Sequence, residues 1–186
     1  MKSGLSFLAF VLIGLSGFSQ TAAEERFSIF LPKKTISESM SDPVIHGGKK
    51  YSQHKIGDLD VMKIPLKDSP LISEEDVIGY SKSSHSIQLS IRALAKVLEL
   101  NEGTVVFICL DRKPIYWGII WSDILSISAS GVIVLKPSPL DLEMNPEYRT
   151  IKIKKGYPTP EWFRGKDPRN NPEIFKSLKK AGKLIE

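Results

Sequence analysis

Short apolar segments alternate with polar or proline-containing stretches along most of the chain, a pattern typical of a protein rich in β-strands. We predict strands at residues 27–31, 59–64, 77–80, 87–89, 105–110, 115–121, 132–135 and 148–153, the last of them at a sheet edge. The segments 105–110 and 115–121 are apolar on both faces, which is typical of central strands covered on at least one side. A polar turn at 111–114 separates them, so the pattern favours a hairpin.

Two segments have the period of an amphipathic helix. In the first, which Ser90 can cap, the apolar residues at helical spacing are Ile91, Leu94, Ala95 and Leu98. The second begins with Asn171 as a plausible N-cap and Pro172 at the first helical position. Its apolar stripe is Ile174, Phe175, Leu178 and Ala181. Between the last two strands, residues 136–148 have the pattern of an extended connection.

Together the strands and helices predict an α+β fold. We expect a two-layer sandwich in which a mixed or antiparallel sheet packs with one central helix and a C-terminal helix. Residues 24–69 would supply N-terminal strands and a polar loop, residues 70–136 an α/β core, and residues 137–186 a basic extension with the terminal helix. All three segments are expected to pack in one domain.

The first 23 residues have the pattern of a secretory signal peptide. Lys2 precedes an apolar run over residues 5–18, and Thr21-Ala22-Ala23 supplies the small residues that signal peptidase accepts. The run is shorter than the ~20 residues that a membrane-spanning helix needs. We therefore predict an exported protein, periplasmic or secreted, cleaved after Ala23 and without an integral span afterwards.

The formal charge of +5 is unevenly distributed along the chain. Residues 150–186 contain ten Lys or Arg and four Asp or Glu. This basic segment can contact an anionic membrane surface, a cell-wall polymer or an acidic partner, or it can simply be a solvated helix face. Aromatic residues are too thinly interleaved for base stacking, so we predict no nucleic-acid partner.

The single cysteine rules out an intramolecular disulfide, so stability must come from packing. Cys109 lies in an apolar run, where it is either a reactive thiol or a small buried hydrophobic residue.

The residues that could carry catalysis form no recognised motif. His46 and His54 flank two loop lysines at no metal-ligand spacing, so we predict no metal and no cofactor. Ser84, His85 and Asp76 can be nominated as a triad, but the chain has no Gly-x-Ser-x-Gly nucleophile elbow. We predict no catalytic residues, with an exported hydrolase using His85 and nearby acids or hydroxyls as the alternative.

Three aromatic residues are candidate ligand-binding residues. Trp117 and Trp121 share one face of the predicted strand 115–121, and Tyr116 lies on the other face with Gly118 beside it. A missing side chain at Gly118 would leave a shallow platform. The alternative is that these aromatic side chains pack as core.

Asp167 and Arg169, in the loop before the C-terminal helix, are the remaining candidate binding residues. They either pair with each other or contact an anionic ligand near the helix N-terminus. In the third alternative, the loop only orients the helix.

Two motifs in residues 70–136 carry a resemblance to a known family. They are Pro70-Leu71-Ile72-Ser73-Glu74-Glu75-Asp76-Val77 and, after the predicted helix, Val106-Phe107-Ile108-Cys109-Leu110-Asp111. Both are similar to motifs of the periplasmic head subdomain of SecD, the export-channel accessory protein. The family usually has Gly directly after that Asp, whereas this chain has Arg112-Lys113-Pro114, which predicts a longer turn. The resemblance implies a small α/β scaffold that contacts exported polypeptide, without the membrane segments that drive proton-coupled movement.

These observations favour an exported, non-catalytic binding module of the bacterial cell envelope. Its expected partner is a polypeptide or an envelope component. A structural part of a larger envelope assembly is a further possibility.

Overall fold

The computed structural model describes residues 26–34, 36, 55–56, 59–145 and 147–186. The predicted signal peptide, His46 and His54 lie outside these residues. The larger sheet contains β1 (Phe27–Phe30), β4 (Val77–Ser81), β5 (Ser86–Leu89), β6 (Val105–Leu110), β7 (Lys113–Trp121), β8 (Ala129–Leu135), β9 (Thr150–Tyr157) and β10 (Leu184–Ile185). A separate small ladder joins β2 (Lys55–Ile56) and β3 (Leu59–Asp60).

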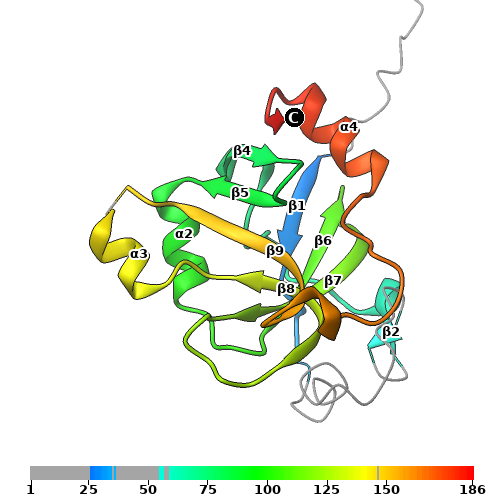
Figure 1. The fold of residues 1–186 in the computed structure, drawn as a ribbon. Helices are drawn as coiled ribbons and strands as arrows, with labels where there is room; N and C mark the ends of the chain where they lie inside the picture. The colour runs from blue at the N-terminus through cyan, green and yellow to red at the C-terminus, as the bar shows by residue number, and fades with distance from the viewer. Residues whose placement is uncertain (1–25, 35, 37–54, 57–58, 146) are drawn as a thin grey trace, which may run out of the picture.

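The described helices are short and lie around the larger sheet (Figure 1). The α-helices are α2 (Ile91–Leu98), α3 (Pro139–Met144) and α4 (Pro172–Lys180). The 3₁₀ helices are η1 (Val61–Lys63), η2 (Glu74–Asp76) and η3 (Pro160–Trp162). No helix in the described part of the chain is long and apolar enough to cross a membrane.

The larger sheet has eight strands in the order β1-β6-β7-β8-β9-β5-β4-β10. The β7–β8 and β10–β4 pairs are parallel and the other pairs are antiparallel. The fold is therefore α+β with a mixed sheet, as predicted. Strands from all three predicted segments pair in this one sheet, so they share one hydrophobic core.

The predicted hairpin is present as the antiparallel pair β6–β7. Its turn is shorter than predicted, because β7 already begins at Lys113 and only Asp111 and Arg112 lie between the strands. Both turn residues have positive φ, 44° and 64°, the combination that matches the twist of two paired strands. The Arg112 guanidinium also donates to the carbonyl oxygens of Asp68 and Lys67, at 2.5 and 3.2 Å, which holds this strained turn against the preceding loop.

Three other predictions about local elements are wrong. β9 lies between β8 and β5, not at an edge. The predicted strand over 59–64 stops after two residues, because the Asp60 carboxylate accepts a hydrogen bond from the Met62 amide and starts η1. The connection over 136–148 contains α3, whose Ser138 and Asp141 form a reciprocal capping box.

Helix α2 forms where predicted, with Ser90 as its N-cap, but it buries a different face. The buried side chains are Ala93, Leu94 and Val97, whereas Ile91, Ala95 and Leu98 are exposed. The reason is that two hydrogen bonds attach the helix to the segment before β4. The Ser90 amide donates to the carbonyl oxygen of Asp76 at 2.8 Å, and the Lys96 ammonium donates to that of Leu71 at 3.3 Å. These bonds to the segment before β4 set the rotation of the helix about its axis.

The two halves of the sheet are covered differently. Every residue of β6 and β8 is buried, which requires cover on both faces. Along β9, by contrast, Ile151 and Ile153 are buried whereas Lys152 is exposed. In the view of Figure 1, α2 lies behind β5 and β9, so the face of these strands toward the viewer is the open one.

Candidate binding surface

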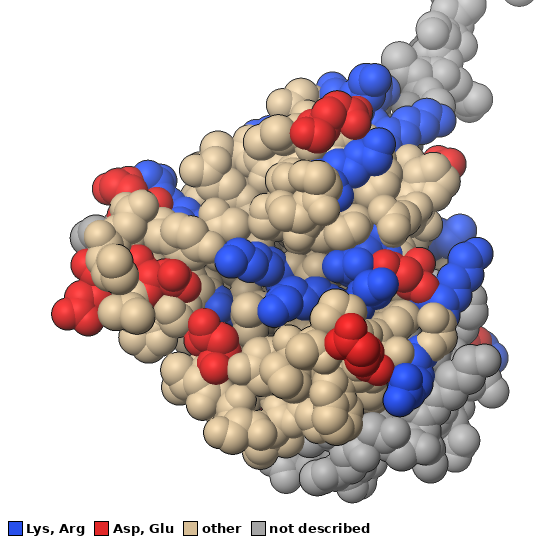
Figure 2. Space-filling view, in the orientation of Figure 1, with Lys and Arg blue, Asp and Glu red and all other residues tan. Residues whose placement is uncertain are grey.

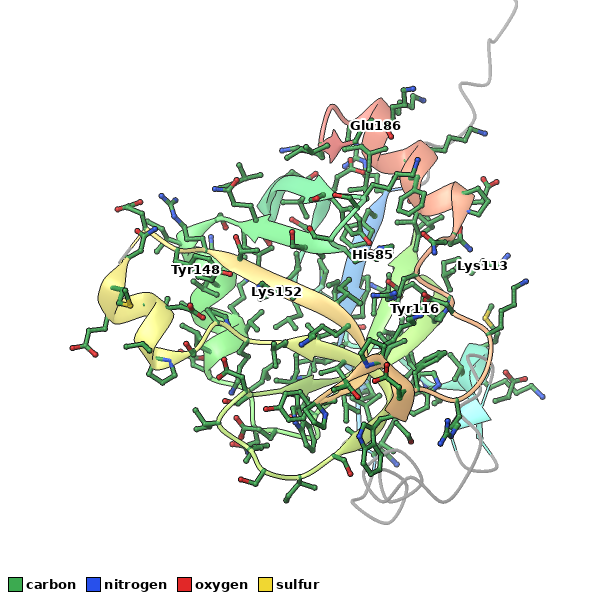
Figure 3. The ribbon with its side chains drawn as sticks, viewed as in Figure 1. His85, Lys113, Tyr116, Tyr148, Lys152 and Glu186 are labelled. Carbon is green, nitrogen blue, oxygen red and sulfur yellow. The ribbon has the colours of Figure 1, made fainter. Side chains whose placement is uncertain are left out.

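The open sheet face over β9 and β5 carries polar side chains, and we call it the lysine face. Its residues are Lys152, Lys154 and Thr150 of β9 with Ser86 and Gln88 of β5. The antiparallel register places Ser86 opposite Lys152 and Gln88 opposite Thr150, and opposed residues project from the same side of a sheet. Figure 2 shows Lys and Arg side chains in a row across this face, and Figure 3 labels Lys152 on β9.

The two lysines of this face have no salt-bridge partner within the described residues. Lys154 does lie over the ring of Tyr157, with its ammonium 6.0 Å from the ring centroid. Alternate residues of a strand are about 6.6–6.8 Å apart on one face, so the side chains of Lys152 and Lys154 leave the backbone of β9 at that spacing. The face can therefore offer two regularly spaced cations to an anionic ligand.

Asp167 and Arg169 are brought together, but their charges are used within the chain. The guanidinium of Arg169 donates to both carboxylate oxygens of Asp167, at 2.9 and 2.8 Å, and to the Ile153 carbonyl at 2.8 Å. The ammonium of Lys155 lies 3.8 Å from the same carboxylate. Burial works to raise the pKa of Asp167, but the bonds from Arg169 outweigh it and lower that pKa. Of the three alternatives from the sequence, the structure contains the pair, which ties the loop before α4 to β9.

His85 lies directly before β5 in a largely buried aromatic cluster and is 7% exposed. Its Nδ1 is 3.1 Å from the Tyr80 hydroxyl, and its ring stacks on Phe175 of α4 with centroids 6.4 Å apart. Burial lowers the pKa of His85, and the positive charges of Arg169 and Lys155 lower it further, against the opposing effect of Asp167. Burial also raises the pKa of Tyr80. The buried environment therefore favours the neutral imidazole of His85 beside the neutral phenol of Tyr80.

The nominated triad does not assemble around His85. The Ser84 hydroxyl bonds to the Ser81 hydroxyl at 2.9 Å, and the Asp76 carboxylate accepts from the Ser90 hydroxyl at 3.2 Å. The hydroxyl within reach of the imidazole is that of Tyr80, which is fully buried. A buried phenol with a raised pKa is a poor nucleophile, so these contacts supply no activated group for the hydrolase alternative.

The predicted aromatic residues lie in the core. Tyr116 is 1% exposed, and Trp117 and Trp121 are each 2% exposed. β7 is a central strand, and the ring of Tyr157 lies 6.3 Å from that of Trp121. The space above Gly118 is also filled, because a Cβ there would lie 2.9 Å from the carbonyl oxygen of Val132. The structure therefore has no shallow platform at Gly118, because β7 and β8 pack closely there.

Cys109 is likewise a core residue with no exposed surface. Burial raises the pKa of its thiol to about 12, so the thiol stays protonated near neutral pH. This environment matches the alternative of a small buried hydrophobic residue.

Two further features of the described residues concern metal ions and cavities. No group of three or more His, Cys, Asp and Glu side chains there is placed to hold a metal ion. A hollow of about 460 Å³ is lined by Lys33, Lys67, Asp68 and Ser69. The Asp68 carboxylate lies 3.0 Å from the Lys33 ammonium, and the lining residues are exposed positions of two loop segments.

The sequence interpretation did not nominate Lys152 or Lys154 individually. The alternation Ile151-Lys152-Ile153-Lys154 was the available signal, since it predicts one buried and one solvated face.

Comparisons with protein-family models, with curated proteins and with solved structures returned no match.

Proposed function

We propose that this chain is an exported, non-catalytic binding module of the bacterial cell envelope, and that its lysine face binds an acidic polypeptide segment. The observation that carries the proposal is the open face of β9, where Lys152 and Lys154 lie without salt-bridge partners in the described structure. The nearby carboxylate of Asp167 is already engaged by Arg169 and Lys155, so it does not neutralise them.

The spacing of the two lysines favours an extended polypeptide as the partner. Alternate side chains of an extended segment repeat at about 6.6–6.8 Å, which equals the repeat of the two ammonium-bearing residues along β9. Gln88, Ser86 and Thr150 beside them offer hydrogen bonds to the partner's backbone or carboxylates. Exposed charges of one sign also raise the rate of encounter with an oppositely charged partner.

The proposed export of the protein and its resemblance to the SecD head rest on the sequence alone. Export follows from the signal-peptide pattern of residues 1–23. The resemblance to the SecD head follows from the motifs at 70–77 and 106–111, and with it we propose the two-layer sandwich and a role in contacting exported polypeptide. A SecD-like head is consistent with a binding role that involves no catalytic group.

The test is binding of fluorescently labelled poly-glutamate, followed by anisotropy at several salt concentrations. We expect Lys152→Glu/Lys154→Glu to weaken binding at least tenfold, since two charge contacts of about 0.7 kcal/mol each are lost and the new carboxylates repel the acidic ligand. Lys176→Glu/Lys179→Glu on α4 is the matched control, because it changes the net charge equally at exposed positions elsewhere.

Equal losses in the two double variants would mean that only net charge matters, and the proposal would fail. Vesicles containing phosphatidylglycerol form the second arm of the experiment. Lys152- and Lys154-dependent binding to vesicles but not to poly-glutamate would assign the face to a membrane surface and overturn the polypeptide partner.

A further inference from the structure

The outer edge of β4 is occupied by a strand of only two residues, β10. β10 runs parallel to β4, with Leu184 opposite Tyr80 and Ile185 opposite Ser81. The Tyr80 amide donates to the Lys183 carbonyl at 2.7 Å, and the Lys82 amide donates to the Ile185 carbonyl at 2.9 Å. The main-chain donors of this edge are therefore satisfied by a very short segment.

The side chains along this edge form two adjacent recognition features. At Gly79 the missing side chain leaves a notch, since a Cβ there would lie 2.9 Å from Cδ1 of Ile185. One residue further along β10, the Glu186 carboxylate lies 3.3 Å from the Lys82 ammonium. An aliphatic side chain followed by a carboxylate thus fits the edge, and Ile185-Glu186 supplies that pair.

β10 is held much less firmly than the helix before it. In α4, Ile174 and Leu178 are almost completely buried, whereas in β10 Ile185 is 55% exposed and Leu184 is only partly buried against the core. Gly182, at φ +68°, turns the chain between the two elements, and a Cβ there would contact nothing within 4 Å. β10 can therefore leave the edge by rotation near Gly182 while α4 keeps its buried contacts.

We propose that the edge of β4 is a binding site for a separate extended polypeptide, added as a parallel strand, and that residues 184–186 occupy this site within the chain. The preferred segment has an aliphatic residue for the Gly79 notch followed by an acidic residue for Lys82. Strand addition of this kind takes affinity from main-chain hydrogen bonds and specificity from side-chain positions. This site goes beyond the lysine face, because it uses the sheet edge instead of the face of β9.

The test uses the full chain and a fluorescein-labelled peptide Ala-Gly-Lys-Leu-Ile-Glu, which copies residues 181–186. Ile185→Asp should release the internal strand, because an ionised carboxylate cannot fill the apolar notch. We expect this variant to bind the peptide at least tenfold more tightly than the unmodified chain, in which residues 184–186 compete. Amide hydrogen exchange at Tyr80 and Lys82 should slow when the peptide binds.

A charge exchange at Lys82 tests the edge, and the restored binding controls for the loss of the contact between the Lys82 ammonium and the Phe175 ring, 5.5 Å from its centroid. Lys82→Glu, added to Ile185→Asp, should weaken binding of the acidic peptide, and a peptide ending in Lys should restore it. Equal binding to the unmodified chain and Ile185→Asp, or no response to the charge exchange, would overturn the proposal. Doubling of the chain's mass in light scattering without peptide uptake would also overturn it, because a second copy would then supply the strand.

Discussion

Replacing Gly118 with alanine would place a methyl group against the backbone of the neighbouring strand. The new Cβ would lie 2.9 Å from the Val132 carbonyl oxygen and 3.2 Å from Val132 Cγ1. Both distances are shorter than ordinary contacts, and Val132 cannot withdraw easily because β8 is paired on both sides and fully buried. β7 and β8 must therefore shift apart, or their side chains must leave preferred rotamers.

The expected magnitude combines two opposing effects. Overpacking in a dense core costs about 1–3 kcal/mol. Against this, alanine reduces the conformational entropy of the unfolded chain relative to glycine, a gain of about 0.4–1 kcal/mol. The midpoints of the two ranges leave a net loss of about 1.3 kcal/mol, which corresponds to a fall in Tm of about 3–5 °C for a chain of this size.

Thermal unfolding followed by circular dichroism measures this change. Gly79→Ala is the matched control, because its new Cβ would meet Cδ1 of Ile185, the end of a half-exposed side chain that can move. We expect a clearly smaller fall in Tm for the control. A Tm for Gly118→Ala equal to or above that of the unmodified protein would refute the close approach of β7 and β8.

Three further predictions concern a buried histidine, a helix cap and a turn. Because the folded state lowers the pKa of His85, the unfolded state binds its proton more readily, and stability should fall as pH drops below about 7. His85→Asn, which tolerates the same positive φ, should flatten urea-midpoint stability between pH 7 and 5. Asn171→Ala should cost about 1 kcal/mol in urea unfolding, since Asn171 caps the Glu173 and Ile174 amides. Arg112→Gly should be about 1 kcal/mol more stable than Arg112→Ala, because φ is +64° there.

Each of these three predictions would be contradicted by a different result. An unchanged pH slope in His85→Asn would mean that His85 is protonated equally in both states, since His46 and His54 are present in both proteins. If Asn171→Ala kept full stability, water would replace the hydrogen bonds of the Asn171 side chain without cost, and the cap would not stabilise the protein. A more stable alanine than glycine variant at Arg112 would contradict the left-handed turn.

Elements built from contacts between near neighbours could be predicted from the sequence. Asn171 and Pro172 sit at the first positions of α4, where a side-chain acceptor and a fixed φ act within one turn. The β6–β7 hairpin follows from two adjacent apolar runs and a polar turn. Helix α3 has local capping residues too, but a proline can either end an element or begin a helix, and Pro139 begins α3.

Properties that depend on distant segments could not be predicted in this way. The buried face of α2 depends on bonds from Ser90 and Lys96 to residues 71–76. Whether Trp117 and Trp121 were core or surface depended on which segments cover β7. The candidate site changed for the same reason, since Asp167 pairs with Arg169 and Lys155, whereas Lys152 and Lys154 have no salt-bridge partner within the described residues.

The amino-acid sequence alone determined the approximate positions of most strands and of helices α2 and α4, because hydrophobic period and caps act over a few residues. The alternation Ile151-Lys152-Ile153-Lys154 also carries the signal for one basic face of β9, although the predicted strand ended at residue 153. Only the tertiary structure decided which strands are neighbours and which faces stay open. Strand neighbours and open faces are set by burial and by hydrogen bonds between segments such as β9 and β5, because these segments lie more than sixty residues apart in the sequence.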